Sequence, residues 1–203
     1  MAVTKTDIVN LAATHLGEKR YTDPFTDTSP TAELLSFRYD FSRKEVLRSH
    51  TWGCAKKDTS LSEDATAPVH TWSKRYLVPQ ESLRLVNIAD TDLDDLHFKE
   101  YELKGQYIHT DLAAPLKITY IRDEEDTSLF DALLIESMAL HLAASCSMAI
   151  ADDKGLTQGL FRLYDSKVEE AKFTDSLQRR RPVDNMYASS AWDSLHHGGE
   201  GAI

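Results

Sequence analysis

Three aspartates in one short segment have the residue type and spacing that suit a metal ion. Asp90, Asp92 and Asp94 alternate in the way that the first ligands of a calcium-binding loop do. Such a loop next needs a glycine and then ends on a bidentate glutamate, and this chain has Asp95 and Tyr101 at those positions. We therefore interpret the segment as a solvated acidic turn, with calcium binding as the less favoured alternative.

A second group of side chains has the spacing of some zinc ligands. His50 and Cys54 are separated by three residues, but a structural zinc site needs a further pair, and Cys146 with His141 is a poor one. Both cysteines lie among apolar residues and give no disulfide framework. We interpret them as buried thiols in a protein that assembles in a reducing compartment, and we expect no metal ion and no cofactor.

The sequence contains no motif that identifies an enzyme. It lacks a phosphate-binding loop, a nucleophile elbow and a dinucleotide-binding fingerprint. Asp and Glu are abundant, with 33 in the chain, but their spacing selects no pair for acid–base catalysis. We expect a protein without catalytic residues, although acid–base sites often lack a local sequence signature.

The acidity of the chain limits its partners. Its 203 residues carry a net charge of −10, whereas a protein that reads a nucleic-acid sequence needs a basic face. The same charge suits a surface past which DNA slides without adhering. Hydrophobic residues make up 41% of the chain, which is enough for a sizeable core. The first residues lack the pattern of a signal peptide.

Caps and apolar periodicity predict two helices in the first part of the chain. The first covers residues 4–16, with Thr4 as its cap and Gly17 just past its end. The second covers residues 30–48 and begins at Ser29-Pro30, a cap followed by a proline at the first helical position.

The second helix carries apolar residues on two stripes, about 120° apart at 3.6 residues per turn. One stripe consists of Leu34, Phe37 and Phe41, and the other consists of Leu35, Tyr39 and Val46. A helix at the edge of a monomer needs one apolar face, so a second face indicates either a central position or a subunit contact. The central position is the more common case, and the candidates for a subunit contact are Leu35, Tyr39 and Val46.

Two more helices are predicted in the last part of the chain. The third begins near Ser128 in a capping-box pattern and contains an apolar run over residues 129–151. That run is long enough to raise the question of a membrane span, but Asp131, Glu136 and His141 are costly in lipid. We expect the central helix of a bundle and no membrane. A fourth, amphipathic helix follows.

The middle of the chain has the alternation of strands. Leu116, Ile118 and Tyr120 alternate with polar residues, and Lys104-Gly105 offers a turn. We expect three or four antiparallel strands between the helical halves. The predicted fold class is mainly α, a helical bundle with a small antiparallel β insertion and an extended C-terminal tail. The predicted parts are a bundle of residues 1–70 and 123–178, an insertion of residues 71–122, and a tail of residues 179–203.

A series of short segments occurs in an order that is more specific than any one of them. The series consists of Ile8-Val9-Asn10-Leu11-Ala12, Leu16-Gly17-Glu18, Val46-Leu47-Arg48-Ser49-His50-Thr51-Trp52, Ala55-Lys56, Trp72, Arg75-Tyr76-Leu77-Val78-Pro79, Leu83-Arg84-Leu85-Val86, Tyr107-Ile108-His109-Thr110-Asp111, Ile118-Thr119-Tyr120 and Phe130-Asp131-Ala132-Leu133. Over residues 6–178 this series resembles the tail tubular protein A family, the head-to-tail adaptors of tailed phages.

The resemblance implies a structural protein of the virion, located at the head–tail junction and assembled in the host cytoplasm. Family members form a homo-oligomeric ring, a dodecamer in short-tailed phages. The ring lies below the portal protein, a nozzle or tail-tube protein attaches beneath it, and DNA passes through the centre without sequence-specific binding. Some members have been discussed as cell-wall hydrolases, so a virion-associated peptidoglycan hydrolase is the alternative, although no residue here supports a catalytic role. A cytoplasmic helical binding protein unrelated to phage is a third hypothesis.

The tail carries no part of the resemblance and has a composition of its own. Arg179, Arg180 and Arg181 form the strongest local charge cluster, and Pro182 ends the preceding helix. A short amphipathic helix is expected after them, with the aromatic anchors that dominate many interfaces. We expect this tail to dock on the portal. The portal-docking candidates are Arg179, Arg180, Arg181, Tyr187, Trp192 and Leu195. A tail that packs on its own bundle or stays disordered is the alternative.

Overall fold

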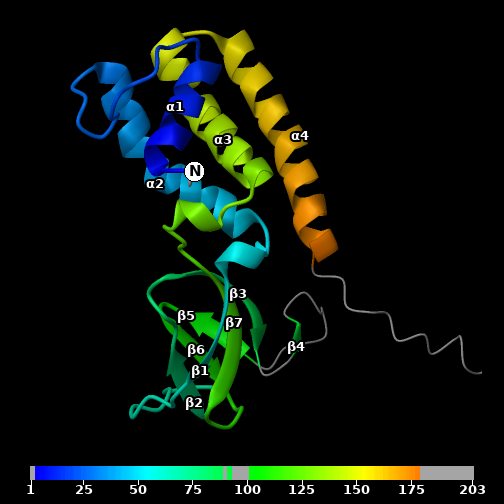
Figure 1. The fold of residues 1–203 in the computed structure, drawn as a ribbon. Coiled ribbons are helices and arrows are strands. Elements are labelled where there is room, and N and C mark those ends of the chain that lie inside the picture. The colour runs from blue at the N-terminus through cyan, green and yellow to red at the C-terminus, as the bar shows by residue number, and fades with distance from the viewer. Residues whose placement is uncertain (1–2, 89–90, 93–100, 179–203) are drawn as a thin grey trace, which may run out of the picture.

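Helices and strands separate into two parts of the molecule, a helical bundle and a pair of antiparallel sheets below it in Figure 1. The computed structural model describes residues 3–88, 91–92 and 101–178. Of these described residues, 50% are helical and 20% lie in strands, which makes the fold α+β. The predicted fold class, a mainly helical bundle with a small β insertion, is therefore wrong. The predicted tail, residues 179–203, lies outside the described residues.

The bundle is built from α1 (Lys5–His15), α2 (Pro30–Ser49), α3 (Ala132–Ala151) and α4 (Lys154–Gln178). α1 begins and ends as its sequence predicts. Thr4 and Asp7 form a capping box, and Gly17 has a positive φ of 74°. The amide of Glu18 donates to the carbonyl of Ala13 at 2.9 Å, which closes the helix in a Schellman motif.

α3 begins later than predicted. Ser128 lies in η2 (Thr127–Leu129), a 3-10 turn that Asp126 caps. The N-cap of α3 is Asp131, whose carboxylate accepts a hydrogen bond from the amide of Leu133 at 2.9 Å. The predicted capping box at Ser128 is wrong because each of two successive turns has its own aspartate cap.

α3 is the central helix, as predicted. It packs against α1, α2 and α4. Among the described residues it is the one helix long and apolar enough to cross a membrane, and 56% of its most apolar window is buried inside the protein. Contact with three neighbouring helices accounts for that apolar composition.

The strands form two sheets, and strands that follow one another in the chain often belong to different sheets. The four-stranded sheet has the order β1 (Lys56–Leu61), β7 (Leu116–Arg122), β3 (Ser82–Ile88) and β4 (Thr91–Asp92). The three-stranded sheet has the order β2 (Lys74–Leu77), β6 (Tyr107–Thr110) and β5 (Tyr101–Lys104). β5 and β6 meet in a two-residue turn, where Gly105 has a φ of 61°. The predicted turn at Lys104-Gly105 is confirmed.

The sheets have a hydrophobic core of their own, separate from the core of the bundle. Its buried residues are Tyr76, Ile88, Ile108, Leu116, Ile118 and Tyr120. A separate core is the physical reason why this part is more than an insertion into a helical fold. The strands also begin earlier than predicted, because β1 starts at Lys56, whereas the predicted insertion starts at residue 71.

The two stripes of α2 have different environments. Leu35, Tyr39 and Val46 are at most 5% exposed and lie in the core of the bundle. Phe37 and Phe41, on the other stripe, are 67% and 53% exposed. The stripe of Leu35, Tyr39 and Val46 therefore has the central position. These three residues do not form a subunit contact, which corrects that prediction.

Candidate functional site

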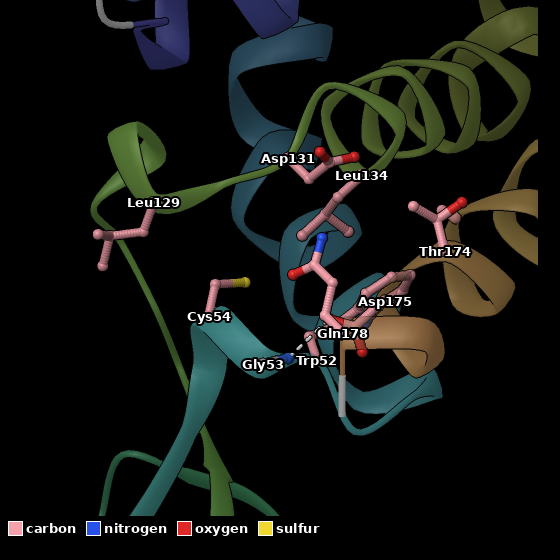
Figure 2. A pocket seen from close by; sticks show the side chains of 10 residues that line it. Trp52, Gly53, Cys54, Leu129, Asp131, Leu134, Thr174, Asp175 and Gln178 are labelled. Atoms are coloured by element: carbon pink, nitrogen blue, oxygen red, sulfur yellow. Dashed lines mark hydrogen bonds between the residues drawn. The ribbon is translucent and has the colours of Figure 1, made fainter. Parts of the chain in front are cut away.

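The candidate site is a cavity where the bundle meets the sheets. Its volume is about 270 Å³, and Figure 2 shows its lining side chains converging from three segments of the chain. The lining residues are Trp52, Gly53, Cys54, Leu129, Asp131, Leu134, Ala171, Thr174, Asp175 and Gln178. We call this region the junction.

Two links of the chain and two helices place these residues together. Trp52, Gly53 and Cys54 lie on the link from α2 to β1, which contains η1 (Gly53–Ala55). Leu129 and Asp131 lie on the link from β7 to α3, and the remaining residues come from α3 and from the last turns of α4. Both chain crossings between the bundle and the sheets therefore pass this cavity.

The link after α2 is fixed by a buried tryptophan. Trp52 is 2% exposed, and its indole N–H donates to the carbonyl of Val46 at 2.9 Å. The ring of His50 packs edge-on against the indole, with centroids 4.8 Å apart. A large side chain with a satisfied donor holds the end of α2 in one geometry.

Asp175 connects the last turns of α4 to the same link. Its Oδ1 accepts a hydrogen bond from the amide of Gly53 at 2.9 Å, drawn as a dashed line in Figure 2. Its Oδ2 lies 3.2 Å from Nε2 of His50. A Cβ at position 53 would lie 3.3 Å from Oδ1 of Asp175, so glycine permits the close approach.

The thiol of Cys54 faces this cavity but is poorly suited to nucleophilic chemistry. Burial, and then the negative charge of Asp175, raise the pKa of Cys54 to about 11. Burial likewise raises the pKa of Cys146 to about 11. At neutral pH both thiols are protonated, and the thiolate is the form that attacks substrates or binds metals.

A second polar cluster joins the bundle to the strand β7. The guanidinium of Arg43, on α2, is 3% exposed and donates to the carbonyl of Glu124 at 2.7 Å. The same group lies 3.1 Å from Asp123, and Lys44 lies 3.3 Å from the other oxygen of Asp123. Arg43 thus ties α2 to the segment between β7 and η2.

Two arginines complete the junction on the side of β3. Arg48, near the end of α2, donates to the carbonyl of Leu83. Arg84 donates from its guanidinium to the hydroxyl of Thr51 at 2.8 Å. A cation near the last carbonyls of a helix is also favoured by the helix dipole. One contact joins the last turn of α2 to β3, and the other joins β3 to the link that follows α2.

The candidates for a metal site do not come together. His50 interacts with Asp175 and Trp52, and the chemistry of Cys54 is that of a buried thiol. Within residues 3–88, 91–92 and 101–178, no group of three or more His, Cys, Asp or Glu side chains could hold a metal ion. Asp90 and Asp94 of the acidic turn lie outside the described residues, and Asp92 ends the short strand β4.

The portal-docking candidates belong to the C-terminal tail. Arg179, Arg180, Arg181, Tyr187, Trp192 and Leu195 all lie outside the described residues. The last described residue before them, Gln178, lines the junction cavity.

Sequence reasoning missed the two residues that do most to fix the junction. For Arg43 a signal was present, because it lies on the buried side of α2 near Tyr39 and Val46, and a charge on an apolar face indicates a buried ion pair. For Asp175 no local signal exists, because its partners are 122 and 125 residues away in the chain.

Comparison with known proteins leaves the junction to be interpreted from its own geometry. No protein-family model matches the chain, and no curated protein matches it.

Proposed function

We propose that this chain is one subunit of a ring that joins the portal of a tailed phage to its tail, and that it has no catalytic activity. The ring is a homo-oligomer, a dodecamer in the favoured version, with the portal on one side and a nozzle or tail-tube protein on the other. DNA passes through the ring without sequence-specific binding, in keeping with the net charge of −10.

One observation carries this proposal. The segments in which the chain resembles the head-to-tail adaptors supply three contacts where the bundle meets the sheets. Trp52 donates to Val46, Arg48 donates to Leu83, and Arg84 donates to Thr51, and all six residues belong to those segments. The resemblance therefore covers the contacts of the two arginines with β3 and with the link after α2, whereas Arg43 and Asp175 lie outside it.

A fixed junction suits an adaptor that connects head and tail. A ring between head and tail has to hold two different neighbours in register, so its subunits need one shape. A half-buried polar cluster around Asp175, a cluster around the buried Arg43, and a buried indole restrict motion between the bundle and the sheets. The alternative, a peptidoglycan hydrolase, needs an activated acid or nucleophile; Cys54 at this cavity does not supply the nucleophile, because its pKa is raised to about 11.

Co-purification and a cell-wall assay test the proposal. The purified chain is mixed with the portal ring encoded by the same phage genome and separated by sedimentation. We expect it to sediment with the portal and to leave cell wall in a zymogram intact. The proposal is overturned if the chain does not sediment with the portal, or if it clears cell wall and one carboxylate substitution abolishes that clearing.

A further inference from the structure

One exposed apolar stripe runs along α2. Phe37 and Phe41 are 67% and 53% exposed, with their ring centroids 5.6 Å apart. With Leu34, Lys44 and Arg48 they occur at steps of three and four residues, the spacing with which one helix contacts another along a seam. The buried residues of α2 lie on the opposite side of the helix.

A second exposed stripe runs along α4. Leu163, Phe173 and Leu177 are 53%, 65% and 51% exposed. With Ser166 and Glu170 they follow the same steps of three and four residues. The buried residues of α4, among them Val168 and Ala171, lie on another face and pack toward α3.

The two stripes belong to helices that run in the same direction. α2 ends at the junction, where His50 lies 3.2 Å from Asp175 near the end of α4. Both helices therefore run from the far end of the bundle toward the sheets, and both pack on α3. Figure 1 shows α2 and α4 on different sides of the bundle. A rotation about an axis along the bundle thus brings α2 of one copy beside α4 of the next, with the helices parallel.

The charges near the stripes fit that parallel arrangement. Beside the apolar residues of α2, the acids Glu33 and Asp40 come first, and Lys44 and Arg48 come later on either side of Glu45. Within the subunit Lys44 also lies 3.3 Å from Asp123, and Arg48 donates to Leu83. Beside the apolar residues of α4, Arg162 comes first and Glu169 and Glu170 come later, and Glu170 also pairs with Lys167. Parallel helices place acid opposite base at both ends, whereas antiparallel helices place like charges together, which is unfavourable.

We propose that the stripe of α2 on one copy packs in parallel against the stripe of α4 on the next copy of this chain. The two surfaces differ, so each copy can bind one neighbour through its α2 stripe and another neighbour through its α4 stripe. Such a heterologous contact closes into a ring when its rotation allows. The assignment of that ring to the head–tail junction rests on the proposed function, but the contact itself does not. Identical acidic chains repel each other, so the isolated contact is weak.

Cysteine cross-linking at high protein concentration tests the contact on the full chain. Three single variants are made, Phe37→Cys on α2 and Leu163→Cys and Phe173→Cys on α4, and each is treated with a short bis-maleimide. The native thiols stay in place, because burial raises the pKa of Cys54 and of Cys146 to about 11 and makes them slow to react. The matched control is Asp165→Cys, which is exposed on α4 away from the stripe.

The mixing pattern decides the outcome. We expect each single variant alone to stay monomeric. Because His50 lies level with Asp175, Phe37 lies level with Leu163, and about 15 Å of helix separates it from the level of Phe173. Phe37→Cys mixed with Leu163→Cys should therefore give dimers, Phe37→Cys mixed with Phe173→Cys should give few, and the double variant Phe37→Cys/Leu163→Cys should give a ladder of dimers, trimers and larger species. Dimers from Phe37→Cys alone, equal dimers with Asp165→Cys, or no dimers in any mixture overturn the proposal. Portal co-sedimentation is measured separately. If the chain binds the portal but does not give this cross-linking pattern, the proposed contact is wrong and the proposed function is unaffected.

Discussion

The carboxylate of Asp175, near the end of α4, accepts a hydrogen bond from the backbone amide of Gly53 at 2.9 Å. Its other oxygen lies 3.2 Å from His50. One side chain thus joins the end of the last described helix to the point where the chain leaves the bundle for the sheets. This contact spans 122 residues of sequence and makes the relative position of bundle and sheets part of the fold.

Replacing Asp175 with alanine is expected to loosen the junction. The substitution removes the charged acceptor of the Gly53 amide, and because that hydrogen bond is exposed to solvent its loss should cost about 0.5–1.5 kcal/mol, as for an ordinary hydrogen bond. We expect the free energy of unfolding, measured with urea, to fall by about that amount. The control is Asp165→Ala on the exposed side of the same helix, which should change it by less than about 0.5 kcal/mol. Equal effects of the two substitutions would show that Asp175 is not a structural contact.

Replacing Arg43 with methionine is expected to be more damaging. The side chain is 3% exposed, and its loss leaves Asp123, itself 16% exposed, with Lys44 as its remaining partner. Removing one member of a buried ion pair costs about 3–5 kcal/mol when the other charge is left unpaired, and because Lys44 remains beside Asp123 we expect a loss near or below the lower end of that range. Lys44→Met is the matched control, because Lys44 contacts the same carboxylate from a position that is 48% exposed. A urea midpoint for Arg43→Met close to that of Lys44→Met contradicts the role given to Arg43.

The stability of the bundle is expected to fall as the pH falls through neutrality, because of His141. Burial lowers the folded-state pKa of His141 below its ordinary value of 6.5, with Arg38 adding to the effect and Glu45 opposing it. The unfolded chain therefore binds a proton that the folded chain does not. The stabilisation from neutral His141 is present above pH 6.5 and is lost as the pH falls below it.

His141→Gln provides the comparison for this pH dependence. Glutamine can still bond to the hydroxyl of Ser42, which lies 2.8 Å from Nδ1 of His141, but it does not titrate. We expect the difference in unfolding free energy between the native chain and the variant to shrink between about pH 7.5 and pH 5.5. A difference that is constant over this range, or that grows on acidification, contradicts a lowered pKa for the buried imidazole.

Deleting residues 182–203 is expected to separate folding from attachment. These residues lie outside the described structure, and we predict that they dock on the portal. Calorimetry should give nearly the same melting temperature for the truncated and the full chain, and sedimentation with the portal should show much weaker attachment. Unchanged portal binding by the truncated chain makes the docking assignment wrong.

The helices were predictable from short-range signals. Thr4, Asp7 and Gly17 are a cap, its box partner and a C-terminal glycine, and each acts within a few residues of the helix end that it marks. The extent of the β part was not predictable in the same way. β1 consists of polar and mostly exposed residues, Lys56 to Leu61, so it lacks apolar alternation, and its pairing with β7 is set by distant partners.

The candidate site was predictable only in its pieces. The order of segments around Trp52 and Arg84 was visible in the sequence, but the hydrogen bond from Arg84 to Thr51, which brings these segments together, follows from tertiary contacts. The two stripes of α2 were also visible in the sequence. Which of them is buried was not predictable, because periodicity shows only that two apolar faces exist, and packing decides which one is covered. Leu35 and Phe37 are both large apolar residues, yet they are 0% and 67% exposed.

Electron microscopy of the chain mixed with the portal ring of the same phage tests the central claim most directly. We predict a closed ring of this chain stacked coaxially on the portal with an open channel through both, and no such ring in images of the chain alone. Portal particles that show no added density, or stable closed rings that form without the portal, would contradict the account of a subunit that assembles on the portal as a head-to-tail adaptor.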